Sequence, residues 1–492
     1  MKKSGFKIWT TGKFIWSGIA ISAAIIAGTI AYGVFIRQKT PFVPENVIFI
    51  IVDTLRADAL GTYGNSRDTS PILDEYARDN VVFDNAWAQG TYTRSSFLSY
   101  MTSSYVRSLG WDYVVPGENP PKGAFCERDD LVTLAEVFKK NGFRNTAVLG
   151  NTFLFPKHGF PRGFHQWNRI PVEEMAGQHL PRWGMKKLVD NDVVNLSIKE
   201  IRKWKPGQKN FLYVHLMDPH LPHSPDAEAR TQMELPPNPR MIRDSDAKRM
   251  AEEGSDADKA MAKEFYYASV YMADKSVGRI LAALKEAGVS GNTLTVISAD
   301  HGEQLFEHGE FNHNAGVWAQ LAHVPLLIGG DGIEHDRVER PVELIDIAPT
   351  ILGFFDIEPP PQWQGEDLFE SDRHRNVTER LGWTSITTDG RYKAILDDKG
   401  EWRLYDLESD PFEQKPIRND NILADIKTTY DVWRKSTPKR EMKAGDPPKG
   451  ICSSKSSEGD NDELMKQLEA LGYVVPEKKP YKSPYKIKKK PQ

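Results

Sequence analysis

Two long apolar runs in this 492-residue chain each end directly in a carboxylate. Residues 46–52, Asn-Val-Ile-Phe-Ile-Ile-Val, are followed by Asp53, and residues 293–299, Thr-Leu-Thr-Val-Ile-Ser-Ala, are followed by Asp300 and His301. Apolar, β-branched runs of this length predict buried strands, and an open α/β sheet gathers functional side chains at the carboxyl ends of its strands. The two runs therefore predict an α/β sheet with one acidic site at its edge.

The pairing of carboxylate with imidazole indicates that this site binds a divalent metal ion. Neutral imidazole with carboxylate suits Zn²⁺, whereas a carboxylate-rich pocket suits Mg²⁺, Mn²⁺ or Ca²⁺, so the identity of the metal stays open. For either acid taken alone, capping the helix that follows is the simpler role. The residues around Asp53 and Asp300 reverse that preference and favour metal binding over helix capping.

Residues 49–64, Phe-Ile-Ile-Val-Asp-Thr-Leu-Arg-Ala-Asp-Ala-Leu-Gly-Thr-Tyr-Gly, resemble the opening motif of the sulfatase family in the alkaline phosphatase superfamily. Similar segments recur in the family's order at 211–223, 300–308, 324–328, 343–350, 404–413 and 468–474. The resemblance implies an alkaline-phosphatase-like α/β fold, with a large mostly parallel sheet between helices and a small C-terminal antiparallel-sheet subdomain. It also implies a metal-dependent hydrolase of sulfate or phosphate esters.

The nucleophile segment departs from the best-known members, which carry a Cys-x-Pro-Ser-Arg motif whose Cys matures to formylglycine. Counting back from Met101-Thr102, which resembles the family's Leu-Thr-Gly, places Thr93 at the nucleophile position, with Thr91 as the alternative. No cysteine lies in this segment, so formylglycine chemistry is excluded. A Thr hydroxyl needs a base or a metal to become a nucleophile, and its ester must be broken by water or an acceptor. Thr93 also suits a helix N-cap, which is compatible with that role.

The resemblance implies that Asp53, Thr93, Asp300 and His301 are the metal ligands. It also places His220, in Asp218-Pro219-His220, where the family has a catalytic imidazole. That imidazole would protonate the leaving group or bind a second metal.

Six further polar side chains are candidates for contact with the substrate: Arg56, Arg94, Asn151, His223, His308 and His313. The two arginines suit an anion clamp, with surface ion pairs as an equal alternative. Asn151 lies where many sulfatases have a Gly-Lys-Trp-His motif, and either a substrate contact or a turn fits it. His308 resembles a family histidine, and His313 stands near a family lysine that binds the anion. His223 suits either a substrate contact or the lining of the mouth.

Seven of the twelve histidines fall within residues 215–223 and 301–323, which independently marks these segments as functional. His215 alternates with apolar residues on a predicted strand, so core packing is its expected role. His323 precedes another buried strand and is expected to be structural.

Residues 14–36 form an uncharged run of 23, against roughly 20 needed to span a bilayer. Positive charge precedes this run, at Lys2, Lys3, Lys7 and Lys13. The pattern predicts a single-pass anchor in the inner cell membrane, with the catalytic body on the periplasmic or extracellular side. A cleaved signal peptide is the alternative.

The predicted organisation follows from these segments: 1–13 cytoplasmic, 14–36 transmembrane helix, 37–45 linker, 46–375 catalytic domain, 376–475 small subdomain and final helix, and 476–492 basic tail. Strands are expected near 46–52, 145–149, 210–216, 293–299 and 324–328, a long helix at 256–287 and a hairpin at 392–405. The lysine-rich tail predicts disorder. It suits a solubilising tail, or contact with anionic lipid or cell-wall polymer. Whether Cys126 and Cys452 pair stays open.

A net charge of −4 and the lack of a nucleic-acid motif argue against a nucleic-acid partner. The expected partner is a sulfate or phosphate ester, which a lipid or glycan could carry. One alternative to hydrolysis is a phosphoethanolamine or phosphoglycerol type of transferase acting on an envelope lipid or glycan, which the Thr and the anchor favour. The other is an inactive family member kept as a binding or scaffold protein.

Overall fold

The computed structural model describes residues 42–109, 131–151, 154, 159–170, 185–237, 241–313 and 316–437. The predicted transmembrane segment 14–36, the tail 476–492 and both cysteines lie outside these residues. Within the described ranges, no helix is long and apolar enough to cross a membrane.

The central sheet is built around strand β1 (Asn46–Val52), in which every residue is buried. On one side β1 pairs in parallel with β5 (Asn210–Leu216), and on the other with β6 (Thr293–Ser298). All three strands are buried throughout, which explains their almost continuously apolar sequences. These three strands were predicted from the sequence, and their carboxyl ends lie at the same edge of the sheet.

The sheet continues on both sides to nine strands among the described residues, in the order β4-β3-β5-β1-β6-β8-β2-β7, with β9 paired to β2. The outer strands are β3 (Arg144–Leu149), β4 (Gln166–Arg169), β8 (Leu326–Gly329), β2 (Val81–Trp87), β7 (His323–Val324) and β9 (Asp336–Glu343). β8 runs antiparallel to both β6 and β2. The sheet is therefore mixed, but among the described strands only β7 and β8 run against the common direction, so the expectation of a mostly parallel sheet holds.

Three strands, β2, β4 and β9, were missed in the sequence because they lack the continuous apolar pattern of the centre. β9 reads Asp-Arg-Val-Glu-Arg-Pro-Val-Glu and its first half is largely exposed, while β4 is only partly buried. The strand expected at 324–328 is instead two strands, β7 and β8, divided at Pro325. Proline has no N–H group to donate to a neighbouring strand, which accounts for the break.

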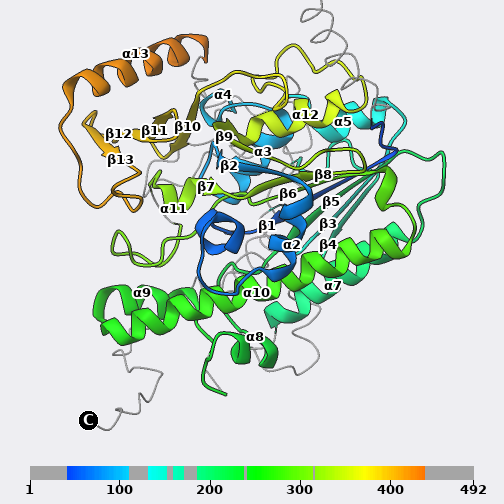
Figure 1. Cartoon of the computed structure of the whole chain (residues 1–492), viewed down its shortest axis with the longest axis horizontal. Helices are drawn as coiled ribbons and strands as arrows, with labels where there is room; N and C mark the ends of the chain where they lie inside the picture. The colour runs from blue at the N-terminus through cyan, green and yellow to red at the C-terminus, as the bar shows by residue number, and fades with distance from the viewer. Residues whose placement is uncertain are drawn as a thin grey trace, which may run out of the picture. The chain divides into compact units, whose positions relative to one another are not determined.

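Helices cover both faces of the sheet (Figure 1). On one face the 31-residue helix α10 (Asp256–Glu286) packs against α7 (Met185–Ile201) and α2 (Pro71–Asp79). Its start is fixed by a capping box between Ser255 and Asp258. On the other face lie α3 (Thr93–Thr102), α5 (Leu134–Lys140) and α12 (Ile347–Gly353). The remaining helical segments are short: η1 (Ala57–Ala59), η2 (Gly61–Tyr63), α4 (Val106–Leu109), α8 (Ala227–Gln232), α9 (Asp244–Glu253), η5 (Ser290–Asn292), α11 (Ala319–Ala322) and η6 (Leu344–Asp346).

A second, four-stranded antiparallel sheet follows, as expected for the C-terminal part. It consists of β10 (Arg375–Arg380), β11 (Trp383–Thr388), β12 (Tyr392–Leu396) and β13 (Trp402–Asp406). The predicted hairpin is β12–β13, with Gly400 at φ 87° in its turn. Helix α13 (Asp420–Ser436) closes this sheet by packing Ile426, Tyr430 and Trp433 onto it.

Hydrogen bonds join β10 to the segment that leads into α3. The hydroxyl of Thr378 donates to the carbonyl of Ala88 at 2.7 Å, and the N–H of Glu379 donates to the carbonyl of Gln89 at 2.9 Å. The small sheet is thereby fixed close to the start of α3.

Candidate active site

The two acids that follow β1 and β6 meet at the edge of the sheet. Asp53, Asp300 and His215 offer ligand atoms that all lie within 4.8 Å of one another, and each of these residues is fully buried. The contact follows from the sheet order, because β1 lies between β5 and β6 in parallel register. The structure thus brings Asp53 and Asp300 together, as the two strand ends predicted.

His215 is buried as expected, but its ring faces the carboxylates instead of the apolar core. Its Nε2 lies 3.2 Å from Asp53 Oδ2 and 3.9 Å from Asp300 Oδ2. Its Nδ1 lies 2.8 Å from the Tyr213 hydroxyl, which is itself 2.7 Å from the Tyr100 hydroxyl. The expectation that His215 packs in the apolar core was therefore wrong. The alternation of residues along β5 does not reveal that Asp53, at the end of the neighbouring β1, lies beside it.

Thr93 is the first residue of α3, and Tyr92 is the N-cap, so the expected N-cap role of Thr93 is wrong by one residue. Thr93 Oγ1 lies 3.4 Å from Nε2 of His301. The Asn151 side-chain amide lies 2.6 Å from Asp53 Oδ2 and 3.5 Å from Thr93 Oγ1. Asn151 thus connects an acid of the cluster with the predicted nucleophile.

Two local contacts distinguish the candidate hydroxyls and orient the imidazole. The Thr91 hydroxyl donates to the carbonyl of Gly316 at 2.9 Å, away from the cluster, which favours Thr93 over Thr91. His301 Nδ1 lies 2.9 Å from the carbonyl oxygen of Gly302. With its proton on Nδ1, His301 presents the lone pair of Nε2 toward Thr93.

The electrostatics of the cluster suit a cation. Burial and the neighbouring charge of Asp53 raise the pKa of Asp300. For Asp53, burial alone would raise the pKa, but His220, His215 and His301 outweigh it and lower the pKa. Asp53 Oδ1 and Asp300 Oδ2 are buried without a hydrogen-bond partner among the described residues. Two buried carboxylates with unsatisfied oxygens are the donor set that a divalent cation would satisfy.

His220 and His313, both predicted from the sequence, lie beside this cluster. The His313 ring lies 4.5 Å from that of His301 and 5.1 Å from that of His220. His220 Nδ1 lies 2.5 Å from the carbonyl oxygen of Leu221, and His313 Nδ1 lies 3.1 Å from Glu303 Oε1. Burial, followed by the charges of His301 and His220, holds the pKa of His313 well below its usual range.

Arg56 does not contact the cluster as a clamp, because its guanidinium is already engaged. It donates to both carboxylate oxygens of Asp58, to Glu307 Oε1 at 2.8 Å and to the carbonyl of Glu303 at 3.1 Å. The structure thus corrects the clamp role of Arg56 to a structural one. Arg94 follows Thr93 in α3 and is buried, and burial lowers its pKa.

The other predicted histidines have aromatic neighbours. His308 stacks on Trp318 with ring centroids 3.8 Å apart, and His223 packs edge-on against Tyr266 and Phe311. These contacts favour structural roles for both, and their substrate contacts stay predictions. His323 stacks on Trp87 and its Nε2 lies 2.8 Å from the carbonyl oxygen of Asp84, as a structural role requires.

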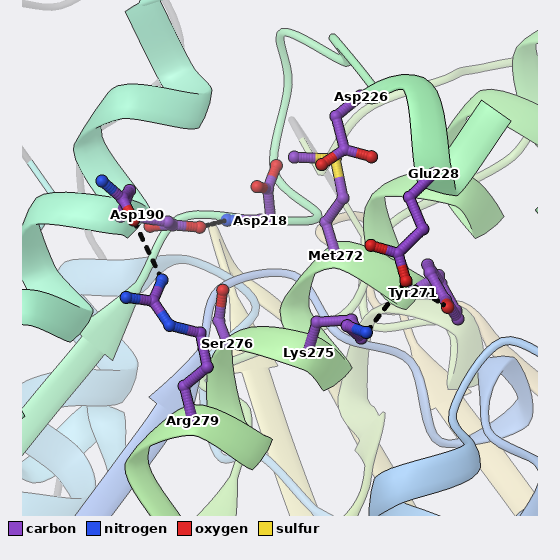
Figure 2. Close-up of a pocket in the computed structure, with 10 residues that line it drawn as sticks. Asp190, Asp218, Asp226, Glu228, Tyr271, Met272, Lys275, Ser276 and Arg279 are labelled. Atoms are coloured by element: carbon purple, nitrogen blue, oxygen red, sulfur yellow. Dashed lines mark hydrogen bonds and ion pairs between the residues drawn. The ribbon is translucent and has the colours of Figure 1, made fainter. Parts of the chain in front are cut away.

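A separate cavity of about 200 Å³ opens between α7, α8 and α10 (Figure 2). Acidic, basic and neutral side chains line it: Asp190, Asn191, Asp218, Asp226, Glu228, Tyr271, Met272, Lys275, Ser276 and Arg279. Lys275 forms an ion pair with Glu228 at 2.9 Å, whereas the guanidinium of Arg279 donates to the neutral amide of Asn191 at 2.9 Å. None of the predicted site residues lines this cavity, which is distinct from the Asp53 cluster.

The sequence profile of the sulfatase family matches residues 45–357. An ulvan-active sulfatase of Formosa agariphila is 26% identical over 427 residues, covering 77% of this chain and 78% of the relative. An arylsulfatase of Clostridium perfringens is 26% identical over 472 residues, covering 79% of this chain and 93% of the relative. Among solved structures, the phosphonate monoester hydrolase of Agrobacterium radiobacter superposes with a TM-score of 0.65 at 18% identity, covering 80% of this chain and 95% of that enzyme.

The profile match covers more than half of the chain, and the two relatives share most of its length. The fold shared with the phosphonate monoester hydrolase fits the same assignment. The chain therefore belongs to the sulfatase family and is a hydrolase of sulfuric or phosphoric esters.

Proposed function

We propose that Thr93 is the nucleophile of ester hydrolysis and that Asp53, Thr93, Asp300 and His301 hold a divalent metal ion. The observation that carries the proposal is the position of Thr93 Oγ1, 3.4 Å from His301 Nε2 and adjoining the buried Asp53–His215–Asp300 cluster. His215 is a further candidate ligand, because the Tyr213 hydroxyl can accept from Nδ1–H and so leave the lone pair of Nε2 for the metal.

The unsatisfied oxygens of Asp53 and Asp300 fit such an ion, which when bound would lower the pKa of a coordinated hydroxyl and polarise the ester oxygens. The side chains of the protein position the nucleophile, attack the ester and protonate the leaving group. Asn151 positions Thr93 relative to Asp53. Thr93 Oγ1, its proton released to solvent, attacks the central sulfur or phosphorus, and the alcohol leaves with a proton supplied by His220. Water then cleaves the Thr93 ester.

The test of the nucleophile is the pair Thr93→Ala and Thr91→Ala. Thr93→Ala is expected to lower kcat for a 4-nitrophenyl ester by about a thousandfold or more, because the covalent step is lost. Thr91→Ala is the matched control, since the Thr91 hydroxyl donates to the carbonyl of Gly316, and this variant should keep kcat within about tenfold. Undiminished turnover by Thr93→Ala would reject Thr93 as the nucleophile.

The metal is tested without reference to activity, by elemental analysis of the purified protein. One divalent ion per chain is expected in the wild type, and a loss of at least half of it in Asp300→Asn. Equal metal content in both proteins would reject this ligand set.

The preferred ester is decided by assays on 4-nitrophenyl sulfate, 4-nitrophenyl phosphate and a phosphodiester. A Thr ester cannot expel sulfate by elimination, as a formylglycine hydrate can, so we propose that the phospho-substrates are turned over faster. The likeness in fold to a phosphonate monoester hydrolase is compatible with this preference. Faster turnover of the sulfate ester would reject it. Transfer to an envelope lipid or glycan is the second possibility, and release of free phosphate or sulfate in step with nitrophenol would count against it.

We further propose that the catalytic body works outside the cytoplasm, attached through residues 14–36. The support is the uncharged 23-residue run preceded by lysines. Protease added to intact spheroplasts should digest the body, whereas protection from the protease would reject this location.

A further inference from the structure

Residues 317–321, which lead into α11 and form most of it, lie directly against the backbone that follows His301. The N–H of Gly302 donates to the carbonyl of Leu321 at 2.8 Å, and a Cβ atom on Gly302 would lie 2.1 Å from the carbonyl oxygen of Gln320. The Nδ1 atom of His301 lies in turn 2.9 Å from the carbonyl oxygen of Gly302. A displacement of residues 317–321 would therefore move Gly302, and with it the His301 ring.

Two charged side chains of the C-terminal part of the chain hold residues 317–321 from the other side. Lys393, in β12, donates from Nζ to the carbonyl of Val317 at 2.7 Å. Glu413, which follows β13, accepts through Oε2 from the N–H of Ala319 at 2.6 Å. Lys393 Nζ and Glu413 Oε1 lie 2.7 Å apart as an ion pair. The two side chains thus bind one carbonyl and one N–H of the same short segment.

Burial fixes the geometry of these contacts. The side chains of Lys393 and Glu413 have no exposed surface. Val317 packs with Ile395 of β12 and Tyr405 of β13 in a buried apolar cluster, which joins the segment to the small sheet a third time. A buried polar group that loses its partner is not rehydrated, so the arrangement in which all of these groups are paired is strongly favoured.

Stability alone does not account for a buried ion pair at this place. Two apolar side chains of similar volume generally serve a fold as well or better, because an ammonium and a carboxylate lose their hydration on burial. Apolar side chains could not, however, bind the carbonyl of Val317 or the N–H of Ala319. The ion pair adds a directional hold on the backbone of residues 317–321, and this backbone is the one that contacts Gly302.

We propose that Lys393 and Glu413 are positioning residues for ester hydrolysis. They fix residues 317–321, and through Gly302 they set the place of the His301 imidazole relative to Thr93. The inference rests on the proposed Thr93 site and adds the C-terminal part of the chain to the groups on which turnover depends. A misplacement of reacting groups by about 1 Å can cost about a hundredfold in rate, so a distant hold of this kind is measurable.

The experiment compares two neutral double variants of the full-length protein, because a single substitution would leave one buried charge without its partner. Lys393→Met/Glu413→Gln loses the bond to Val317 but keeps an oxygen for the N–H of Ala319, whereas Lys393→Met/Glu413→Met loses both bonds. Both kcat and KM are measured well below the Tm of each variant, on the 4-nitrophenyl ester that the wild type hydrolyses fastest.

The first double variant should lower kcat by about tenfold and the second by about a hundredfold, because His301 is progressively less well placed. KM should stay within about threefold of the wild type in both, because the loss falls on the transition state and not on substrate binding. The difference between the two variants measures what the oxygen that faces Ala319 contributes, which a loss of charge alone would not explain.

Arg391→Gln/Asp406→Asn is the matched control, because this ion pair, 3.0 Å long, adjoins the same small sheet and its arginine is half exposed. It should keep the wild-type kcat. Wild-type kcat in the first double variant, a loss carried by KM alone, or an equal loss in the control would overturn the proposal.

If the second double variant does not fold, the first decides by itself, because it retains the acceptor for Ala319. The two proposals also fail separately. Undiminished turnover by Thr93→Ala rejects the nucleophile, whereas undiminished turnover by the first double variant rejects only the positioning role of Lys393 and Glu413.

Discussion

At the scale of a single residue, close packing explains why a glycine, Gly302, follows His301 after β6. A Cβ atom at this position would lie 2.1 Å from the carbonyl oxygen of Gln320 and 3.1 Å from a side-chain carbon of Arg56. The N–H of Gly302 also donates to the carbonyl of Leu321 at 2.8 Å. The absence of a side chain therefore lets the backbone beside His301 lie directly against the segment before β7.

We expect Gly302→Ala to lower Tm by more than about 4 °C, because the clash is with backbone that cannot rotate away. It should also lower kcat, since His301 is the preceding residue. Gly291→Ala is the control, because its nearest atom would be 3.7 Å away. Thermal unfolding of both variants checks this, and equal Tm values would contradict it.

At the scale of elements, helix α2 is capped by a side chain from another helix. The carboxylate of Asp274, in α10, accepts from the N–H groups of Ile72 and Leu73 at 3.1 and 2.7 Å. Ser70, the N-cap residue, makes no capping bond of its own. The sequence predicted α10 from its own period and cap, but a cap that is 201 residues away cannot be identified locally.

This cap predicts a pH dependence of stability. Burial raises the pKa of Asp274 to about 7, although the N–H donors of Leu73 and Ile72 oppose the rise. The folded protein therefore binds the proton more tightly than the unfolded chain, whose value is 3.8, so the contribution of Asp274 to stability falls as pH rises from about 4 through 7. The change amounts to at most about 4 kcal/mol.

Asp274→Asn, which stays neutral, removes this dependence. Relative to that variant, the wild type should become less stable between pH 5 and pH 8. Urea unfolding of both proteins across this range measures the difference. A difference in free energy of unfolding that does not change with pH would show that Asp274 ionises normally.

At the scale of the whole molecule, the site is made by pieces that lie far apart in the chain. Asp53 follows β1, His215 belongs to β5, Asp300 follows β6 and Thr93 starts α3. The small sheet is attached to the central sheet through a buried cluster. In this cluster Arg373, just before β10, pairs with Glu343 of β9 at 2.5 Å and with Asp346 at 2.7 Å. Assembly of the acidic cluster thus requires the pairing of β1 with β5 and with β6.

Metal removal should consequently affect the stability of the whole fold. Without a cation, Asp53 and Asp300 remain buried and close together, so a chelator is expected to lower Tm of the wild type. A bound ion at a hundred times its Kd contributes about 2.7 kcal/mol. Asp300→Asn should show a smaller response to the chelator. Scanning calorimetry with and without chelator decides this, and an unchanged wild-type Tm would argue against a metal in this cluster.

The sequence alone determined the positions of Asp53 and Asp300, because an acid that ends an apolar strand is a local pattern. It also determined the central strands, helix α10 and the hairpin of the small sheet, whose periods and turn residues are local too. Which side chains contact one another in the folded protein was decided only by the tertiary structure. Because of the sheet order, His215 lies beside Asp53 instead of packing in the apolar core. Arg56 forms ion pairs with Asp58 and Glu307, so its guanidinium is not available as an anion clamp. The contact between Arg380 and Tyr92 likewise joins the end of β10 to the start of α3. Such pairings depend on how strands and helices are arranged in space, and a linear pattern does not carry that information.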